Sequence, residues 1–465
     1  MIQRNFLSIL LLMVLTLPCH SQDIIIETEV ITLPHSNTDD ECVGTFATHF
    51  LDHITTTPNG NEIRQFEANG SGVAINDLDN DRDLDIVLAN HFGLNTILWN
   101  EGNLNFRTER LSHGDSRAVT IVDFDGDGWN DIFFTRTLTA PSYWHNKGNG
   151  TFELQIIPNV AEPLYSVAWA DIDRDGDLDL VGGSYDAALL DAFGQEFLLN
   201  SRGGVYYYEN EDGTLNPKKL INRAQALALI LTDINNDTLL DIVVGNDFAV
   251  PDFFWLQTDD GWQNTSGFDT FTYSTMSYDF ADINNDGKNE IFSTDMKPYA
   301  TESTEAWQPI LDDMHNTYQR GNNPQVMENV LLSQSSDSAF ENHATNMGID
   351  ASGWSWSGKF GDLDQDGFLD LYIVNGFIEY TLFAHLDNHE LIEQNLGFRN
   401  IDGNIFEHKP QWGLGSPSSG RGMSMADLDM DGDLDIVVNN LRNSAELFEN
   451  QLCTGTSLQV DLKWH

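Results

Sequence analysis

The residues of this chain best suited to chemistry lie in short acidic stretches, and that chemistry is cation binding. DFDGDGWNDI, residues 123–132, has aspartates at its first, third, fifth and ninth positions and a glycine at its sixth. Calcium prefers about six to eight hard oxygen ligands, which alternate carboxylates in a tight loop can supply. The glycine permits the sharp turn that gathers those oxygens. The spacing therefore predicts a calcium site in this stretch.

The same stretch recurs six more times, so it is one copy of an internal repeat. Successive copies start 46 to 80 residues apart. We expect the calcium ligands at the first, third, fifth and ninth positions of every copy. They are Asp77, Asp79, Asp81 and Asp85; Asp123, Asp125, Asp127 and Asp131; Asp171, Asp173, Asp175 and Asp179; Asp233, Asn235, Asp237 and Asp241; Asp282, Asn284, Asp286 and Glu290; Asp362, Asp364, Asp366 and Asp370; and Asp427, Asp429, Asp431 and Asp435.

The copies differ in how well they suit calcium. The second, third, sixth and seventh have four carboxylates and the glycine, whereas the first has Arg82 in place of the glycine. The fourth has Asn235 and Thr238, and the fifth has Asn284 and Glu290. We expect up to seven calcium sites, four firm and three weaker, with dissociation constants of roughly 10⁻⁴ to 10⁻³ M.

Two other interpretations of the loops are disfavoured. An EF-hand needs a glutamate at its twelfth position and flanking helices, but the chain has Phe134 there, inside a strand-like run. Alternatively, the loops are solvated acidic turns that bind nothing. Carboxylates at this spacing would then repel one another strongly, and seven copies in register favour a bound cation.

Regular runs around each loop predict the elements that position it. An apolar run such as AVTIV (118–122) precedes the loop, and a β-rich run such as DIVLAN (85–90) follows it. A third run ends in Asn or Gln, as in SYWHN (142–146), and a fourth begins with an aromatic residue or Leu, as at Phe152. Turn residues separate the third run from the fourth. The predicted fold class is all-β: a seven-bladed β-propeller with a calcium loop between the first and second strands of each four-stranded blade.

The N-terminal strand is expected to close the ring. No convincing fourth strand follows AELFEN (445–450), whereas TFATHFLDH (45–53) has the register of one. Closure of this kind removes two exposed sheet edges. Cys42 and Cys453 fall at the same turn of this last blade, and an exported protein can keep a disulfide. We expect a Cys42–Cys453 disulfide, with two unpaired thiols as the alternative.

The N-terminus has the composition of a secretory signal peptide. Residues 1–21 contain Arg4, then an apolar run too short to span a bilayer comfortably, then a small polar exit. We expect cleavage after this segment and a secreted, periplasmic or cell-surface protein with no transmembrane segment. Lipidation of Cys19 is the alternative, although the residues before it, 16–18, suit lipidation poorly.

The charge balance limits the classes of partner. Asp and Glu number 73 against 22 Lys and Arg, a formal net charge of −51. Nucleic acids require clustered Lys and Arg, so we expect no nucleic-acid partner. We expect the partner to be an extracellular or envelope protein or a glycan. The protein itself is expected to be a monomer.

The chain has none of the common catalytic motifs. HExxH, GxSxG and the phosphate-binding loop are absent, and the glycine-rich stretch 413–422 lacks the lysine that a phosphate loop needs. His385 and His389 are four residues apart and could pair as metal ligands on one helical face. We expect an exposed polar helix there instead.

A pair of tryptophans and a pair of arginines lie in or near the strands that enter the acidic loops. Trp354 and Trp356 alternate in the strand that enters the sixth loop and are expected to pack between blades, with a sugar platform as the alternative. Arg117 and Arg421 each lie six residues before the first loop aspartate of their blade. We expect both arginines to neutralise neighbouring carboxylates, and a ligand contact in the channel is the alternative.

These loops, in blades of this plan, resemble the FG-GAP/VCBS repeats of the integrin α-chain propeller. Three phrases resemble more specifically the ASPIC/UnbV family, which includes cartilage acidic protein: STDMKP (293–298), GWSWSGKFGDLDQDG (353–367) and GRGMSMADLDMDGDLDIVVNN (420–440). Such propellers host many tasks, so the resemblance implies the fold more than a function. The family continues into a C-terminal UnbV segment, and SLQVDLKWH (457–465) resembles its opening strand. A truncated member or an incomplete gene model is therefore expected.

The expected organisation is a signal peptide (1–21), a lead-in (22–42), the propeller (43–452) and the start of a truncated UnbV-like segment (453–465). The expected function is non-catalytic binding or adhesion, with the long insertions at 183–205 and 297–325 as candidate binding rims. The alternative is a carbohydrate-active enzyme of the polysaccharide-lyase kind, which needs His, Tyr, Arg and Lys clustered on one face.

Overall fold

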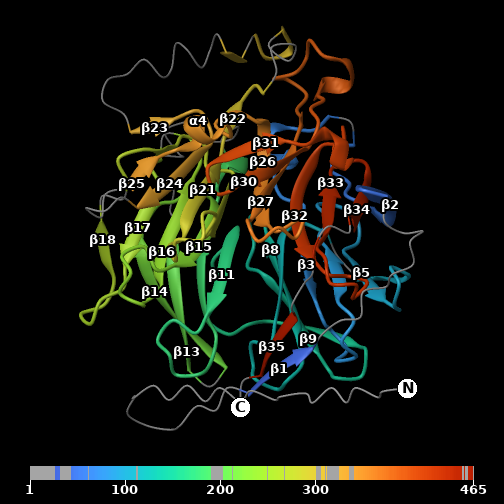
Figure 1. Cartoon of the computed structure of the whole chain (residues 1–465). Helices are drawn as coiled ribbons and strands as arrows, with labels where there is room; N and C mark the ends of the chain where they lie inside the picture. The colour runs from blue at the N-terminus through green and yellow to red at the C-terminus, as the bar shows by residue number, and fades with distance from the viewer. Residues whose placement is uncertain are drawn as a thin grey trace, which may run out of the picture.

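Seven antiparallel sheets, one carrying each acidic loop, make up most of this computed structural model (Figure 1). Sheet order follows chain order in the first four blades. The structure describes residues 27–31, 43–60, 62–111, 114–189, 203–211, 213–248, 250–265, 268–299, 305–308, 310–311, 324–334, 340–452, 455 and 459–463. The first four blades are β3 (Val73–Asn76), β4 (Asp85–Leu88), β5 (Thr96–Asn100) and β6 (Phe106–Arg110); β7 (Ser116–Val122), β8 (Asp131–Arg136), β9 (Ser142–Asn146) and β10 (Phe152–Gln155); β11 (Ser166–Ala170), β12 (Asp179–Gly183), β13 (Val205–Glu211) and β14 (Thr214–Ile221); and β15 (Ala226–Thr232), β16 (Asp241–Asn246), β17 (Phe253–Leu256) and β18 (Gln263–Thr265).

Of the last three blades, the fifth keeps this plan with an insertion between its second and third strands, and the other two vary it. The sixth gains an additional strand, and the seventh takes its fourth strand from the N-terminus. The three blades are β20 (Ser277–Ala281), β21 (Glu290–Thr294), β24 (Val330–Gln334) and β25 (Phe340–Asn342); β22 (Met296–Lys297), β26 (Gly353–Gly361), β27 (Asp370–Asn375), β30 (Leu396–Ile401) and β31 (Ile405–His408); and β32 (Gly420–Ala426), β33 (Asp435–Asn440), β34 (Ser444–Gln451) and β2 (Thr45–Ile54). The predicted seven-bladed propeller is confirmed.

The predicted closure of the ring is also confirmed. β2 pairs antiparallel with β34, with Phe46 opposite Asn450 and His49 opposite Leu447. A separate two-stranded sheet joins β1 (Glu27–Ile31) to β35 (Gln459–Lys463), at the bottom of the view in Figure 1. The segment that resembles the opening of an UnbV domain therefore forms a strand, and its partner is the lead-in. Cys42, Cys453 and residues 1–21 lie outside the described residues.

Short elements connect the blades. They are η1 (Gln65–Ala68), η2 (Ala187–Leu189), α4 (Ala344–Met347), η4 (Asp387–His389) and η5 (Pro410–Trp412), with the paired strands β19 (Phe271–Thr272) and β23 (Gln325–Val326), and β28 (Phe377–Ile378) and β29 (Glu390–Leu391). The expected polar helix across His385 and His389 was wrong. Only the three-residue η4 forms, because Asn388 and His389 have left-handed backbones with φ of 55° and 57°.

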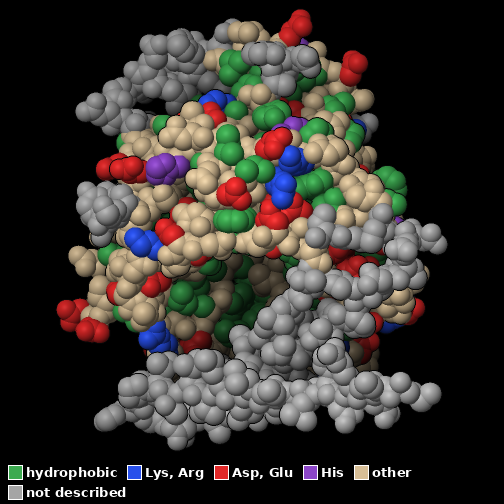
Figure 2. Space-filling model, in the orientation of Figure 1, with side chains coloured by type: hydrophobic (Ala, Val, Ile, Leu, Met, Phe, Trp, Pro, Cys, Tyr) green, Lys and Arg blue, Asp and Glu red, His purple; other side chains and the backbone are tan. Residues whose placement is uncertain are grey.

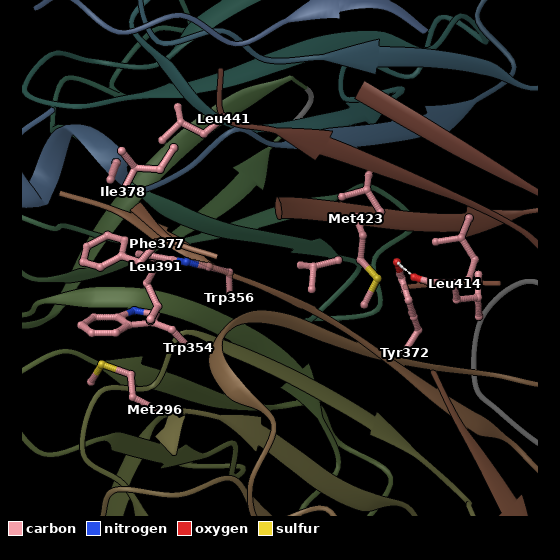
Figure 3. Packing of buried hydrophobic residues seen from close by; sticks show 14 of the residues in the cluster. Met296, Trp354, Trp356, Tyr372, Phe377, Ile378, Leu391, Leu414, Met423 and Leu441 are labelled. Carbon is pink, nitrogen blue, oxygen red and sulfur yellow. Dashed lines mark hydrogen bonds between the residues drawn. The ribbon is translucent and has the colours of Figure 1, made fainter. Parts of the chain in front are cut away.

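The apolar core lies between blades rather than within one sheet. Val87 and Ile97 of the first blade share a cluster with Ile132 and Phe134 of the second. Between the sixth and seventh blades, Trp354 and Trp356 pack into another cluster, confirming their expected core role (Figure 3). Each blade therefore depends on its neighbour to bury its apolar face.

Candidate metal centres

The strands place every acidic loop in the same way. β7 ends at Val122 and the loop begins at Asp123; the ninth position, Asp131, is the first residue of β8. The other six loops also start directly after the first strand of their blade and end at the first residue of the second. The first and ninth positions of all seven loops therefore have the same place in their blades.

A left-handed backbone at the sixth position makes the turn. Gly128 has a φ of 88°, and the residues without a glycine there adopt the same region, with φ of 82° at Arg82 and 76° at Thr238. The sequence did not signal that the fourth position is left-handed too. It is so in every copy, at Asn80, Gly126, Arg174, Asn236, Asn285, Gln365 and Met430.

The ninth carboxylate ties the loop to the blade. In the first blade, one oxygen of the buried Asp85 accepts a 3.0 Å hydrogen bond from the amide of Leu78, and the other accepts one of 2.8 Å from the amide of Asn100. Asp179, Asp241, Asp370 and Asp435 accept the equivalent pair of bonds in their blades. The side chain at the ninth position thus joins the second and third strands to the loop through hydrogen bonds within the protein alone.

Carboxylate oxygens converge in several of the loops. In at least four loops, three acidic side chains have oxygens that all lie within 4.8 Å of one another. The groups are Asp77, Asp79 and Asp85; Asp123, Asp125 and Asp131; Asp171, Asp173 and Asp175; and Asp362, Asp364 and Asp370. Each group contains three of the four side chains that the spacing predicts as ligands of its loop, and Asp81, Asp127, Asp179 and Asp366 are not in these groups.

Amide side chains change the fourth and fifth loops. The Asn235 amide donates a 2.9 Å hydrogen bond to Asp237, and the Asn284 amide donates one of 3.2 Å to Glu290. Asp233 and Asp282 accept backbone bonds from the fifth position of their own loops. In the seventh loop, Asp433 adds a buried acid beside Asp427, Asp429, Asp431 and Asp435.

Side chains that were not predicted from the sequence reach into the loops from third strands, among them Tyr143, whose hydroxyl donates to Asp131 at 2.7 Å, His145 and Arg399. Nδ1 of His145 lies 3.3 Å from both Asp125 and Asp131, and the ring also groups with Asp127. In the sixth blade, Nε of Arg399 lies 2.6 Å from Asp364 and Nη2 lies 2.8 Å from Asp366. His145 and Arg399 directly precede the strand-ending Asn of their blades, and that shared position was the available signal.

Burial and mutual repulsion raise the pKa of many loop acids. Desolvation, the largest cause, raises the pKa of Asp85 to about 7 and that of Asp370 to about 8. Burial, followed by repulsion from Asp431, raises the pKa of Asp433 to about 9. Acidic side chains are also spread over the face seen in Figure 2, among few Lys and Arg. The loops therefore carry charge that the described protein groups leave largely uncompensated.

The donor atoms suit a hard cation. Oδ1 of Asp77 and Oδ1 of Asp171 are buried and have no hydrogen-bond partner among the described residues. Buried polar atoms are ordinarily paired, so oxygens left free inside an acidic loop are positioned for a ligand. Oxygen-only donor sets are typical of calcium rather than of zinc or copper, which favour nitrogen and sulfur.

The amides that end the third strands bond across the blade boundary. The Asn146 side chain donates a 2.7 Å hydrogen bond to the carbonyl of Leu78 in the preceding blade. Six of the seven blades make this bond to the second loop position of the preceding blade. The pairs are Asn100 to Leu428, Asn146 to Leu78, Asn210 to Phe124, Gln257 to Ile172, Asn400 to Ile283 and Asn450 to Leu363.

The expected role of Arg117 and Arg421 was wrong. Among the described residues, neither makes an ion pair with a carboxylate; both donate to backbone carbonyls and hydroxyls. They lie at the starts of β7 and β32, whereas the acidic loops follow the ends of those strands. Six residues of extended strand place the two features roughly 20 Å apart.

Parts of the two insertions that were predicted as binding rims lie outside the described residues, including 190–202 and 312–323. Within the part that is described, no helix is long and apolar enough to cross a membrane.

Comparisons with known proteins agree with the fold. The family described as FG-GAP-like repeat matches residues 77–134 and 123–182, which are the first copies of the acidic repeat. No curated protein matches the chain. A crystal structure of BBS1N in complex with ARL6DN, soaked with mercury, is similar over 87% of this chain and 96% of that chain, at 7% identity and a TM-score of 0.50. A lead-soaked crystal of the same complex is similar over 89% and 99%, at 7% identity and a TM-score of 0.48. The chain therefore carries FG-GAP-like repeats within a seven-bladed propeller.

Proposed function

We propose that this FG-GAP propeller is an exported, calcium-stabilised module that binds a protein or a glycan without catalysis. The observation that carries the calcium part is the convergence of three carboxylates within 4.8 Å in four loops. The unpaired Oδ1 atoms of Asp77 and Asp171 support it, because buried oxygens of this kind need a partner. The side chains at the first, third, fifth and ninth positions would hold the ion. Once bound, it would neutralise the loop and fasten the first strand of the blade to the second.

The binding part rests on the fold and on the exposed loops. Propellers are rigid scaffolds whose connecting loops vary without disturbing the blades, and such loops commonly carry binding residues. BBS1N was crystallised with a protein bound, which supports a protein partner for a chain of this fold. The composition of residues 1–21 supports export, and the phrases at 293–298, 353–367 and 420–440 support membership of the ASPIC/UnbV family. A net charge of −51 suits a partner with basic patches.

A binding screen tests this proposal. The purified full chain is applied to arrays of extracellular proteins and of glycans, once with calcium and once with EDTA, and acidic polysaccharides are incubated with it and checked for cleavage. We expect reproducible retention on one class of partner that weakens in EDTA. Cleavage of a polysaccharide would contradict the non-catalytic role in favour of a lyase. Failure to be retained on either array would contradict the binding role.

A further inference from the structure

A second polar site lies at the end of the propeller channel opposite the acidic loops. A cavity of about 300 Å³ is lined mainly by residues at the starts of the first strands, among them Arg117, Tyr165, Trp356 and Arg421. The chain thus places basic side chains at one end of its first strands and acidic loops at the other. None of the predicted metal ligands lines this cavity.

Two arginines are buried there without a carboxylate partner. Arg117 is 5% exposed and Arg421 is 3% exposed, and neither forms an ion pair among the described residues. Nη1 of Arg117 donates to the carbonyl of Asn69 at 2.7 Å, and Nε of Arg421 donates to that of Ala68 at 2.6 Å. The two guanidinium groups thus bond to consecutive residues, and both arginines line the same cavity. Burying two cations around one cavity is costly unless an anion accompanies them.

The electrostatics of the surrounding groups agree with this arrangement. Burial lowers the pKa of Arg421 to about 9, and Glu390 only partly opposes that shift. The pKa of the buried His91 is lowered by burial first and then by Arg117 and Arg421. Glu390 therefore offsets only part of the positive charge in this part of the channel.

Two buried donors of residues that line the cavity have no hydrogen-bond partner among the described residues. They are Nη2 of Arg421 and the hydroxyl of Tyr165, which is 6% exposed. Buried donors of this kind are unfavourable when left unpaired, more so where the group is charged, so a ligand that accepts from both would be favoured. The Arg421 guanidinium also lies over the Trp356 ring, 4.3 Å from its centroid, which fixes its orientation.

The rest of the cavity wall is largely apolar. Val167, Leu229 and Met276 line it beside the polar groups. A ligand that fits this cavity therefore has a negative charge, atoms that accept hydrogen bonds from a guanidinium and from a phenol hydroxyl, and an apolar part. Arginine binds carboxylates and phosphates alike, and the apolar wall favours an anion that carries an organic body over an inorganic one.

We propose that this cavity binds a small organic carboxylate, held by Arg421 and the Tyr165 hydroxyl beside the charge of Arg117, with its apolar part against Leu229 and Met276. The site is independent of the calcium loops and goes beyond the proposed function. It gives the two arginines the anion that the protein itself does not supply.

Calorimetry on the full chain tests the proposal, with benzoate as the probe and the uncharged benzamide as its neutral counterpart. Inorganic sulfate tests the alternative anion class. The informative variant is Tyr165→Phe, which removes only a hydroxyl that makes no hydrogen bond among the described residues. Its matched control is Tyr208→Phe, because the Tyr208 hydroxyl is also buried without a partner but lies outside the cavity.

We expect benzoate to bind and benzamide not to bind, with and without EDTA. Benzoate affinity should fall about tenfold in Tyr165→Phe and stay within about twofold in Tyr208→Phe. Arg421→Lys should abolish binding; if that variant does not fold, the tyrosine pair still decides. Absence of benzoate binding, equal binding of benzamide, or an unchanged affinity in Tyr165→Phe would each overturn the proposal. Binding of sulfate in place of benzoate would overturn the assignment to carboxylates.

Discussion

The side-chain amide of Asn146 in the second blade donates a 2.7 Å hydrogen bond to the backbone carbonyl of Leu78 in the acidic loop of the first. The same amide donates to the carbonyl of Asn130, while its oxygen accepts from the amide of Gly148. One buried side chain thus joins the third strand of its own blade to the metal loop of the neighbouring blade. Loop geometry and ring assembly are therefore coupled.

Replacing Asn146 with alanine should destabilise the propeller by about 2–4 kcal/mol, because it leaves buried polar groups of two blades unpaired. Urea unfolding of the purified variant measures the loss. Asn149→Ala is the matched control: among the described residues, the Asn149 side chain bonds only to Thr151 in an exposed turn, so its cost should stay below about 1 kcal/mol. Equal effects of the two substitutions would rule out a role for Asn146 in joining blades.

The sixth loop position should prefer glycine for backbone reasons alone. A Cβ added at Gly128 would meet no atom within 4 Å, yet its φ of 88° strains any other residue. We expect Gly128→Ala to cost about 1–2 kcal/mol and Arg82→Gly to be neutral or stabilising by up to about 1 kcal/mol. Unfolding measured in EDTA separates this effect from metal binding. Destabilisation by Arg82→Gly would contradict the account of the turn.

Stability should fall as the pH rises from about 4 to 7, in part because of Asp252. Burial raises the pKa of this carboxyl from 3.8 to about 7, although Asn246, Tyr278 and Thr275 donate hydrogen bonds to it. The folded chain therefore holds a proton that the unfolded chain has released over that range, and the advantage is lost as the pH passes 7. Asp252→Asn imitates the protonated form. The loss between pH 4.5 and 8, which is about 3 kcal/mol for this group, should be smaller in the variant. Parallel curves for the two proteins would show that Asp252 does not titrate as stated.

Arg399 should compete with calcium for the sixth loop. Its guanidinium lies within 2.8 Å of Asp364 and Asp366, which are predicted ligands. Removing this charge with Arg399→Gln should raise the calcium affinity of that loop about tenfold, because a competing cation is lost. Calcium titration calorimetry compares the variant with Arg107→Gln, whose side chain pairs with Glu101 and Glu109 instead. Indistinguishable isotherms for the two variants would exclude competition.

The repeat made the propeller predictable, because each copy specifies a loop and the strands beside it. In the sequence, the ends of the third strands are marked only by Asn or Gln. Their hydrogen bonds across blades could not be predicted, because these bonds form only when the blades pack into the ring. His145 and Arg399 were missed for a similar reason, since they reach their loops through strand pairing far along the chain. The error over Arg117 and Arg421 was avoidable. Six residues of extended strand separate each arginine from its loop, which is too far for an ion pair.

The most direct test of the central claim is the melting temperature of the EDTA-treated chain as calcium is added. Ligands that bind only the folded state add about 1.4 kcal/mol per site at ten times the dissociation constant, so occupancy of several loops should raise the melting temperature by many degrees. The double variant Asp171→Asn/Asp173→Asn should show a smaller rise, since it disables one loop with three converging carboxylates. A melting temperature that is the same in EDTA and in millimolar calcium would contradict a calcium-stabilised propeller.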